Sequence, residues 1–282
     1  MLGQVCVGQR SPGRFTRAEP HLPDRPQRSY SDHPIAATES FTQPMVFAMI
    51  NTQHLKDTIK VCMFDQYGTI VDMQGGLTRI AAPYLEAKGW KGNPDSFVTW
   101  WRRTHFENSM IDALLHKQHT SYREIGFRAV CNVLDRCGLA YSDHEVRDLV
   151  SEIEKLECFP EVPASLSKLQ TKYQLVVLSN GDPDMLEAAK QYHQVPFDRV
   201  ISVSEANSFK PHVATYTKAA ELVGVRMDQI LFVANHAFDV IGAKSAGMAT
   251  AFINRRDRPF ERTPHQPDIV VRTMKDLADS LV

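Results

Sequence analysis

Val61-Cys62-Met63-Phe64-Asp65-Gln66-Tyr67-Gly68-Thr69 joins a short apolar run to a carboxylate and a glycine turn. Short runs rich in Val, Ile, Leu and Phe, separated by helix-length segments, are typical of buried parallel strands joined by crossover helices. The pattern predicts an α/β fold with a doubly wound parallel sheet, in which sites lie at the carboxyl ends of the strands. Further strands are predicted at Leu175–Leu178, Arg199–Val203, Ile230–Val233, Thr250–Ile253 and Ile269–Val271.

The segments between these strands are predicted to be helices, because apolar residues recur in them at helical spacing. In the second half of the chain the predicted helices are Asp184–His193, Val213–Val223 and Phe238–Ala246. Between the first and second strands the chain is predicted to be helical almost throughout, with helices at Asp95–His116, Tyr122–Cys137 and His144–Leu156. These inserted helices follow the first strand directly, so we expect them to cover Asp65 as a cap.

Three regions are therefore expected: an α/β core formed by residues 57–74 and 164–282, a helical cap at 75–163, and a segment at 1–56 whose composition differs from that of the rest. Six of the sixteen prolines lie before Met45, among polar residues without a sustained period of 2 or 3.6. Such a stretch buries too little apolar area to offset its ordering entropy. We expect a disordered leader or an extension upstream of a start at Met45 or Met49.

Composition excludes several classes of protein. Of the 282 residues 43% are hydrophobic and 23% are charged, which is ordinary for a globular protein, and the net charge of −1 gives no general attraction to nucleic acid or to an anionic membrane. No apolar run approaches the ~20 residues that span a bilayer. The five cysteines form no C-x-x-C pair, and no secretory signal is evident, so the cytoplasm is the expected compartment.

Polar residues follow four of the predicted strands, at the point where each strand ends. Asp65 follows the first strand, Ser179 and Asn180 follow the second, Lys210 opens the helix after the third, and Asp239 comes shortly after the fourth. One such residue is ordinary turn chemistry. Four in order at one edge of a parallel sheet indicate a site that combines carboxylate, hydroxyl and lysine.

With these residues the chain resembles the haloacid dehalogenase superfamily and, within it, the (S)-2-haloacid (L-2-haloacid) dehalogenases. The resemblance extends from about Lys60 to Val282. It rests on Phe-Asp-x-Tyr-Gly-Thr at 64–69, Leu-Ser-Asn-Gly at 178–181, Lys-Pro-x4-Tyr ending at Tyr216, Ile-Leu-Phe-Val-x5-Asp ending at Asp239, and Trp-Arg-x4-Glu starting at Trp101. It implies a Rossmann-like core with a helical cap, a hydrolase of carbon–halide bonds, a small 2-haloacid and water as its substrates, and a homodimer.

The resemblance also implies nucleophilic catalysis by Asp65. Its carboxylate would displace halide from C2 of a small (S)-2-haloalkanoic acid, and water would then hydrolyse the aspartyl ester to the 2-hydroxy acid. Thr69 is expected to hydrogen-bond the carboxylate of Asp65. Lys210 is expected to pair with Asp65 and Asp239 and to keep the nucleophile ionised, and Asp239 to help place the water. A solvated lysine at a helix start is the alternative role of Lys210.

A second set of residues is expected to hold the substrate. Arg102, on a predicted cap helix, would reach the halide or the carboxylate. Ser179 and the main chain near Gln66 and Tyr67 would hold the substrate carboxylate in place for attack. The remaining substrate contacts are expected from Asn180, Tyr216 and Asn235, although Asn180 could simply turn the chain and Tyr216 could simply pack its helix.

Tyr67 argues against a phosphatase. Phosphatases of this superfamily place a second Asp two residues after the nucleophile, where it protonates the leaving group. A tyrosine, with an ordinary pKa of about 10, does not supply that proton near neutral pH. A phosphate dianion beside Asp65 would also need a metal ion, whereas halide leaves without a proton. Tyr67 thus favours displacement at carbon, with no metal and no cofactor; packing under the cap is its alternative role.

The largest departure from the family is Ala234-Asn235-His236, where well-known members have Ser-Ser-Asn. Ala234 lacks the hydroxyl of the first serine, and His236 replaces an asparagine that helps to position water. We hypothesise that His236 positions the water or acts as a general base, because imidazole exchanges protons near neutral pH. A histidine hydrogen-bonded to the helix start is the alternative. The departure leaves fluoroacetate, or a strained cyclic amino acid, open as substrates.

Two other groups of residues carry no expected function. His116 and His119 lack further ligands at metal spacing, so zinc is not expected. Arg255, Arg256, Arg258 and Arg262 are expected to form a solvated loop rather than a nucleic-acid surface, because no aromatic residues are interleaved with them. The rival functions are a displacement hydrolase of a non-halogen 2-substituted acid, a magnesium-dependent phosphatase, and a non-catalytic binding protein.

Overall fold

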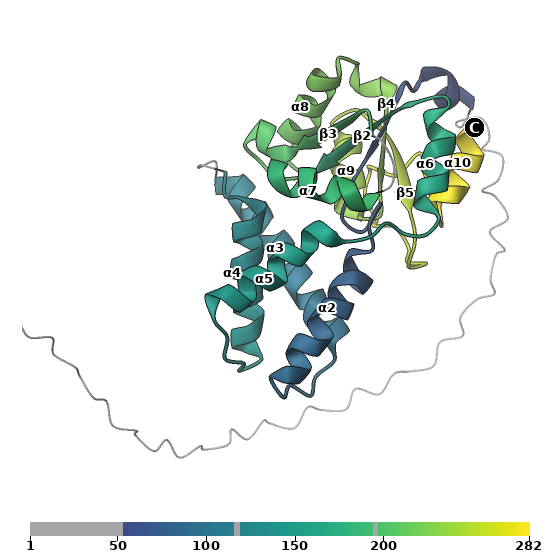
Figure 1. Ribbon diagram of the computed structural model, residues 1–282. Helices are drawn as coiled ribbons and strands as arrows, with labels where there is room; N and C mark the ends of the chain where they lie inside the picture. The colour runs from purple at the N-terminus through teal and green to yellow at the C-terminus, as the bar shows by residue number, and fades with distance from the viewer. Residues whose placement is uncertain (1–52, 116–118, 194–196) are drawn as a thin grey trace, which may run out of the picture. The chain divides into compact units, whose positions relative to one another are not determined.

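The computed structural model describes residues 53–115, 119–193 and 197–282 (Figure 1). Most of the segment expected to be a leader therefore lies outside the described residues, as does His116. Residues 53–58 are helical, and Leu55 is buried in the hydrophobic core. The folded region thus already includes residues 53–56, which we had assigned to the leader.

Six parallel strands form one sheet in the order β3-β2-β1-β4-β5-β6. From β1 the chain adds strands in one direction, and from β4 it adds them in the other, so the sheet is doubly wound as predicted. The switch point lies between β1 and β4, which pair from Val61↔Ile230 to Phe64↔Val233. The strand bounds, each within one residue of the prediction, are β1 Val61–Phe64, β2 Gln174–Ser179, β3 Arg199–Ser202, β4 Ile230–Ala234, β5 Ala249–Ile253 and β6 Ile269–Val271.

The helices of the core connect these strands. They are α6 Val162–Gln170, α7 Pro183–His193, α8 Val213–Val223, α9 Ala237–Ser245 and α10 Met274–Leu281, with short 3-10 turns at Val203–Ala206 and Met227–Gln229. Helix α6 packs beside α10, and α8 packs beside α9. All four residues of β1 are buried, so the central strand is covered on both faces, as a parallel sheet requires.

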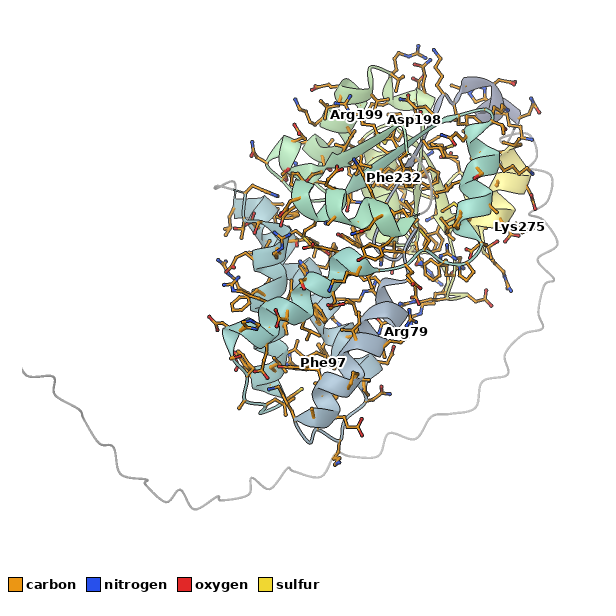
Figure 2. The ribbon with its side chains drawn as sticks, in the orientation of Figure 1. Arg79, Phe97, Asp198, Arg199, Phe232 and Lys275 are labelled. Atoms are coloured by element: carbon orange, nitrogen blue, oxygen red, sulfur yellow. The ribbon has the colours of Figure 1, made fainter. Side chains whose placement is uncertain are left out.

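The inserted cap is helical, as predicted. Its helices are α2 Met73–Ala87, α3 Pro94–Leu115, α4 Tyr122–Arg136 and α5 Asp143–Ser151, followed by a 3-10 turn at Glu152–Lys155. Ser142 caps α5 in a reciprocal capping box with Glu145. A phenylalanine is buried in each part: Phe232 in the sheet of the core and Phe97 in the cap (Figure 2). The charged side chains of Arg79 and Lys275 lie at the surface.

The carboxylate of Asp182, in the loop after β2, is hydrogen-bonded to the start of a cap helix. Asp182 is buried, and its two oxygens accept hydrogen bonds from the main-chain N–H groups of Tyr122 (2.8 Å) and Arg123 (3.0 Å), the first two residues of α4. A carboxylate at a helix N-terminus satisfies free N–H groups and offsets the positive end of the helix dipole. The loop that carries Ser179 and Asn180 is thereby joined to the cap.

No helix within the described ranges combines the length and the apolar character that a membrane span requires.

Candidate active site

Asp65 stands at the carboxyl end of β1 and is almost fully buried. Its main-chain N–H still donates to Val233 O (3.0 Å), which continues the β1–β4 ladder to the site. One carboxylate oxygen accepts from the Thr69 hydroxyl (2.8 Å), and the other accepts from Lys210 Nζ (2.9 Å). The hydrogen bond predicted between Thr69 and Asp65 is therefore present.

Lys210 lies beneath Asp65 and makes three hydrogen bonds. Its ammonium donates to Asp65, to Asp239 Oδ2 (2.7 Å) and to Leu178 O (2.9 Å), which uses all three of its donors. The other oxygen of Asp239 accepts from the Tyr216 hydroxyl (2.6 Å). Lys210 is 1% exposed, so the solvated-lysine alternative is excluded by burial.

This arrangement sets the charge of Asp65. Burial alone would raise the pKa of Asp65, but the Lys210 ammonium, with His236 nearby, holds it well below its usual range. Burial raises the pKa of Asp239, although Lys210 opposes this effect. Burial opposes the charge of Lys210 as well, yet its two carboxylate partners raise its pKa. Asp65 is thus an ionised carboxylate in a closed site.

The Thr69 hydroxyl links two strand ends. It donates to Asp65 and accepts a hydrogen bond from the main-chain N–H of Asn235 (2.9 Å). The direction of its proton is fixed, because the Asn235 N–H can only donate. Asn235 is therefore linked to the Asp65 carboxylate through its main chain and the Thr69 hydroxyl.

Arg102 and His236 meet across the site from opposite sides of the core–cap boundary. Arg102, on α3, donates to Gln74 Oε1 (2.7 Å), and its Nη2 lies 3.2 Å from His236 Nε2. Because a guanidinium only donates, Nε2 accepts and the ring proton is on Nδ1, which lies 3.7 Å from Asp65 Oδ2. The imidazole makes no capping hydrogen bond at the start of α9, so the helix-start alternative for His236 is wrong.

Gly68 makes room for this contact. Its φ is +93°, a left-handed conformation that L residues rarely adopt, and a Cβ there would lie 2.8 Å from His236 Cε1. The glycine of the opening motif is required both by the turn and by the imidazole.

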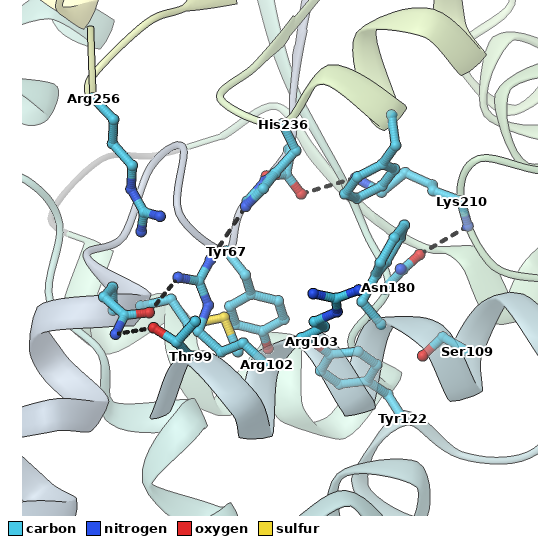
Figure 3. A pocket seen from close by; sticks show the side chains of 15 residues that line it. Tyr67, Thr99, Arg102, Arg103, Ser109, Tyr122, Asn180, Lys210, His236 and Arg256 are labelled. Atoms are coloured by element: carbon cyan, nitrogen blue, oxygen red, sulfur yellow. Dashed lines mark hydrogen bonds and ion pairs between the residues drawn. The ribbon is translucent and has the colours of Figure 1, made fainter. Parts of the chain in front are cut away.

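A cavity of about 310 Å³ opens above Asp65 (Figure 3). Its apolar wall includes Tyr67 and Tyr122, whose rings stack at 5.6 Å, and Phe106 and Phe238, whose rings lie 4.0 Å apart. Its polar lining comprises Asp65, Gln74, Thr99, Arg102, Arg103, Ser109, Asn180, Lys210, His236 and Arg256. The volume suits a small acid, and Phe106 lies four residues after Arg102, on the same face of α3.

Several predicted substrate contacts do not line this cavity. The Ser179 hydroxyl accepts from Gly181 N (3.2 Å). The Gln66 amide lies beside His193 (3.5 Å), and Tyr216 reaches Asp239 from behind. These side chains are buried and have partners outside the cavity lining; Tyr216 belongs to α8, and the contact expected of Gln66 was through its main chain, which its side-chain partner does not test. Asn180 does line the cavity. Its Oδ1 also accepts a hydrogen bond from the main-chain N–H of Lys210 (3.0 Å), which helps to position the lysine.

Other lining residues were missed from the sequence. Phe106 could have been found from its helical spacing to Arg102, whereas Gln74, Tyr122 and Phe238 carry no local signal. Arg256 is exposed, as expected of a solvated loop, but it also lines the cavity. Arg255, also expected to be solvated, pairs with Glu161 and donates to Thr69 O (3.0 Å). Among the described residues no group of three or more His, Cys, Asp or Glu is arranged to hold a metal ion.

Known proteins are similar to this chain in sequence and in fold. The family profile described as haloacid dehalogenase-like hydrolase matches residues 59–247. The chain is 32% identical over 199 residues to an (S)-2-haloacid dehalogenase of Xanthobacter autotrophicus (70% of this chain, 76% of the relative), and 28% identical over 219 residues to haloacetate dehalogenase H-2 of Moraxella sp. strain B (77% and 95%). It superposes on L-2-haloacid dehalogenase from Xanthobacter autotrophicus with chloropropionic acid covalently bound, with a TM-score of 0.71, 27% identity, and coverage of 78% of this chain and 97% of that one.

Proposed function

Because the chain belongs to the haloacid dehalogenase-like hydrolases, we propose that it converts small (S)-2-haloalkanoic acids to 2-hydroxy acids through an aspartyl ester on Asp65, without a metal ion. The observation that carries the proposal is the Asp65 carboxylate, kept ionised by Lys210 at the floor of a small cavity opposite the Arg102 guanidinium. The named relatives act on 2-haloacids and haloacetate, which supports the same substrate class here.

In the first step an Asp65 oxygen forms a bond to C2 as the carbon–halogen bond breaks, and halide leaves with the electron pair. In the second step water attacks Cγ of Asp65, and the bond breaks between Cγ and the ester oxygen that came from Asp65 and is now attached to C2. This oxygen leaves as the hydroxyl group of the product. The products are the 2-hydroxy acid with inverted configuration, halide and one proton. Arg102, which also lines the cavity, offers positive charge to the substrate.

Tyr67 supports displacement at carbon over phosphoryl transfer. It stands where a phosphatase has its acid, and burial raises its pKa well above the ordinary value for tyrosine. Its ring stacks on Tyr122 of the cap, and its hydroxyl is buried without a hydrogen-bond partner among the described residues. A proton held this firmly is not available to a leaving group near neutral pH.

The proposal is tested by measuring halide release from each enantiomer of 2-chloropropionate in the presence of EDTA. Chloride should appear from the (S) form only, together with (R)-lactate, and at a rate that added Mg²⁺ does not raise. Absence of chloride from both enantiomers, followed by turnover of fluoroacetate or of a strained cyclic amino acid, would reassign the substrate. Hydrolysis of p-nitrophenyl phosphate that depends on Mg²⁺ would contradict the proposal.

His236 is proposed to act in the second step. In the structure its Nε2 lone pair faces Arg102 and its Nδ1–H points toward Asp65. When the guanidinium turns to a substrate anion, Nε2 becomes free to orient the attacking water and accept its proton. Ala234 offers no hydroxyl for this purpose.

Replacing His236 by alanine should slow hydrolysis of the aspartyl ester by about 10²-fold, the usual effect of losing a general base, and leave its formation largely intact. Rapid-quench mass spectrometry of the enzyme should then show the ester accumulating in a single turnover. Gln74→Leu is the matched control, because it removes the other Arg102 partner and spares the imidazole. Unchanged ester hydrolysis in His236→Ala, or the same defect in both variants, would exclude this role.

A further inference from the structure

Arg256 brings a second guanidinium to the site from a part of the chain outside the family match. It follows β5 by three residues, whereas the match ends at residue 247. Its side chain reaches from this segment toward the side of the cavity where Arg102 lies (Figure 3). Two residues of the segment that was expected to be solvated therefore lie against the site: Arg256 lines the cavity, and Arg255 donates a hydrogen bond to Thr69 O (3.0 Å).

A second hollow adjoins the catalytic cavity at this point. It has a volume of about 250 Å³, and its lining shares Gln74, Arg102, His236 and Arg256 with the cavity. Arg255 and Asp72 also line it, but both have partners: Arg255 pairs with Glu161, and Asp72 caps α2 and lies near Arg79. Arg102 and Arg256 thus stand at the junction of the two spaces.

Neither guanidinium at this junction has a carboxylate partner. Arg102 contacts the neutral groups Gln74 and His236, and its Nε is buried without a hydrogen-bond partner among the described residues. Arg256 forms no ion pair with any residue that the structure describes, whereas Arg103, on the other side of the cavity, pairs with Glu107 (2.8 Å). Burial lowers the pKa of Arg102 to about 10, and the charge of Arg256 acts in the same direction.

Arg256 is exposed, so solvent weakens the repulsion between its charge and that of Arg102, and an anion bound between the two guanidinium groups would offset the rest. A small monocarboxylate whose C2 lies against Asp65 would fit within the catalytic cavity and would not need to extend into the adjoining hollow. We propose that the substrate of this site is a 2-halo acid with a second carboxylate, and that Arg256 binds this second group at the junction with Arg102. This proposal rests on the proposed function and narrows its substrate class to short dicarboxylic acids.

The test compares (S)-2-chloropropionate with (S)-2-chlorosuccinate and (S)-2-chloroglutarate. The wild type should prefer at least one of the dianions, and Arg256→Gln should lower the ratio of kcat/KM for dianion over monoanion by roughly 10- to 100-fold, the effect of one charged hydrogen-bond donor. Arg256→Lys should retain part of the preference. Arg258→Gln is the matched control, since Arg258 lies in the same segment but lines neither hollow, and it should leave the ratio unchanged.

Binding of inert anions separates this proposal from the proposed function. By calorimetry, succinate or glutarate should bind the wild-type protein more tightly than propionate, and Arg256→Gln should remove most of the difference. If the wild type releases no halide but still prefers the dianions, dehalogenation fails and the anion site stands. A preference that is absent in the wild type, or that Arg256→Gln leaves unchanged, overturns the proposal.

Discussion

Replacing Asp65 by asparagine should reduce halide release by at least ~10⁴-fold, as removal of a covalent nucleophile usually does. The amide is close in shape to the carboxylate, so the strand and the cavity should be preserved. It carries no negative charge, however, and Lys210 still neutralises Asp239 beneath it. Halide release by the purified variant measures the loss of catalysis, and its thermal unfolding tests whether the fold is preserved.

An isotope experiment gives this prediction an independent check. In repeated turnovers in H₂¹⁸O, one ¹⁸O should enter the Asp65 carboxylate, while the product of the first turnover should carry an unlabelled hydroxyl. Mass spectrometry of the peptide that contains Asp65 detects the label. An Asp65→Asn variant with turnover near that of the wild type, or label found only in the product, would show that water attacks the substrate directly.

Replacing Lys210 by methionine should reduce kcat/KM at neutral pH by about 10²- to 10³-fold. It should also lower the free energy of unfolding by about 3–5 kcal/mol, because the wild-type Lys210 neutralises two buried carboxylates and the variant leaves both without a cation. In the wild type Lys210 holds the pKa of Asp65 below its usual range, so the nucleophile stays ionised down to acidic pH. Without this cation, burial dominates and the pKa rises.

The sign of the pH effect follows from the direction of these shifts. The acid limb of the kcat/KM profile should move to higher pH in Lys210→Met, and part of the activity should return in alkaline buffer. Asp65 in the wild type contributes stability above the pKa of an unfolded aspartate, and this stability is lost as the pH falls through the lowered folded value. In the variant the folded pKa is raised, so urea denaturation should give lower stability at pH 8 than at pH 5.

Lys244→Met is the control for the pH profile of kcat/KM and for the urea denaturation. Lys244 pairs with Asp268 at 2.6 Å, so the same chemical change removes a lysine–aspartate pair outside the site. Its pH–rate profile should match that of the wild type. An unshifted acid limb in Lys210→Met would mean that another group keeps Asp65 ionised.

Where the sequence predicted structure well, the signal was local. A buried parallel strand must be apolar throughout, so the run from Val61 to Phe64 marks β1 by itself, and the first polar residue marks the edge of the sheet. The positions of Asp65, Lys210 and Asp239 at one edge follow from strand ends alone. Their mutual hydrogen bonds then follow from the burial of three charges together.

Where it predicted less well, the deciding contact depends on the conformation of a turn or on the docking of distant parts of the chain. Ser179 lies at the predicted strand end, yet the partner of its hydroxyl depends on how the following turn folds. The contact between Arg102 and His236 depends on how the cap docks onto the core. Arg256 has an arginine-rich neighbourhood typical of solvated loops, and only the tertiary structure brings it to the cavity.

The order of strands also governs how the protein can be made. The central strand β1 is among the first elements to leave the ribosome, yet its neighbours begin at Gln174 and Ile230. At ~5–20 residues per second, an entirely apolar segment therefore waits several seconds or more for its first partner. The cap helices are synthesised in that interval, and contacts between helices close in sequence form fast. Among the residues that the structure describes, the insertion that covers Asp65 in the finished protein is thus the main folded neighbour available to β1 during much of translation.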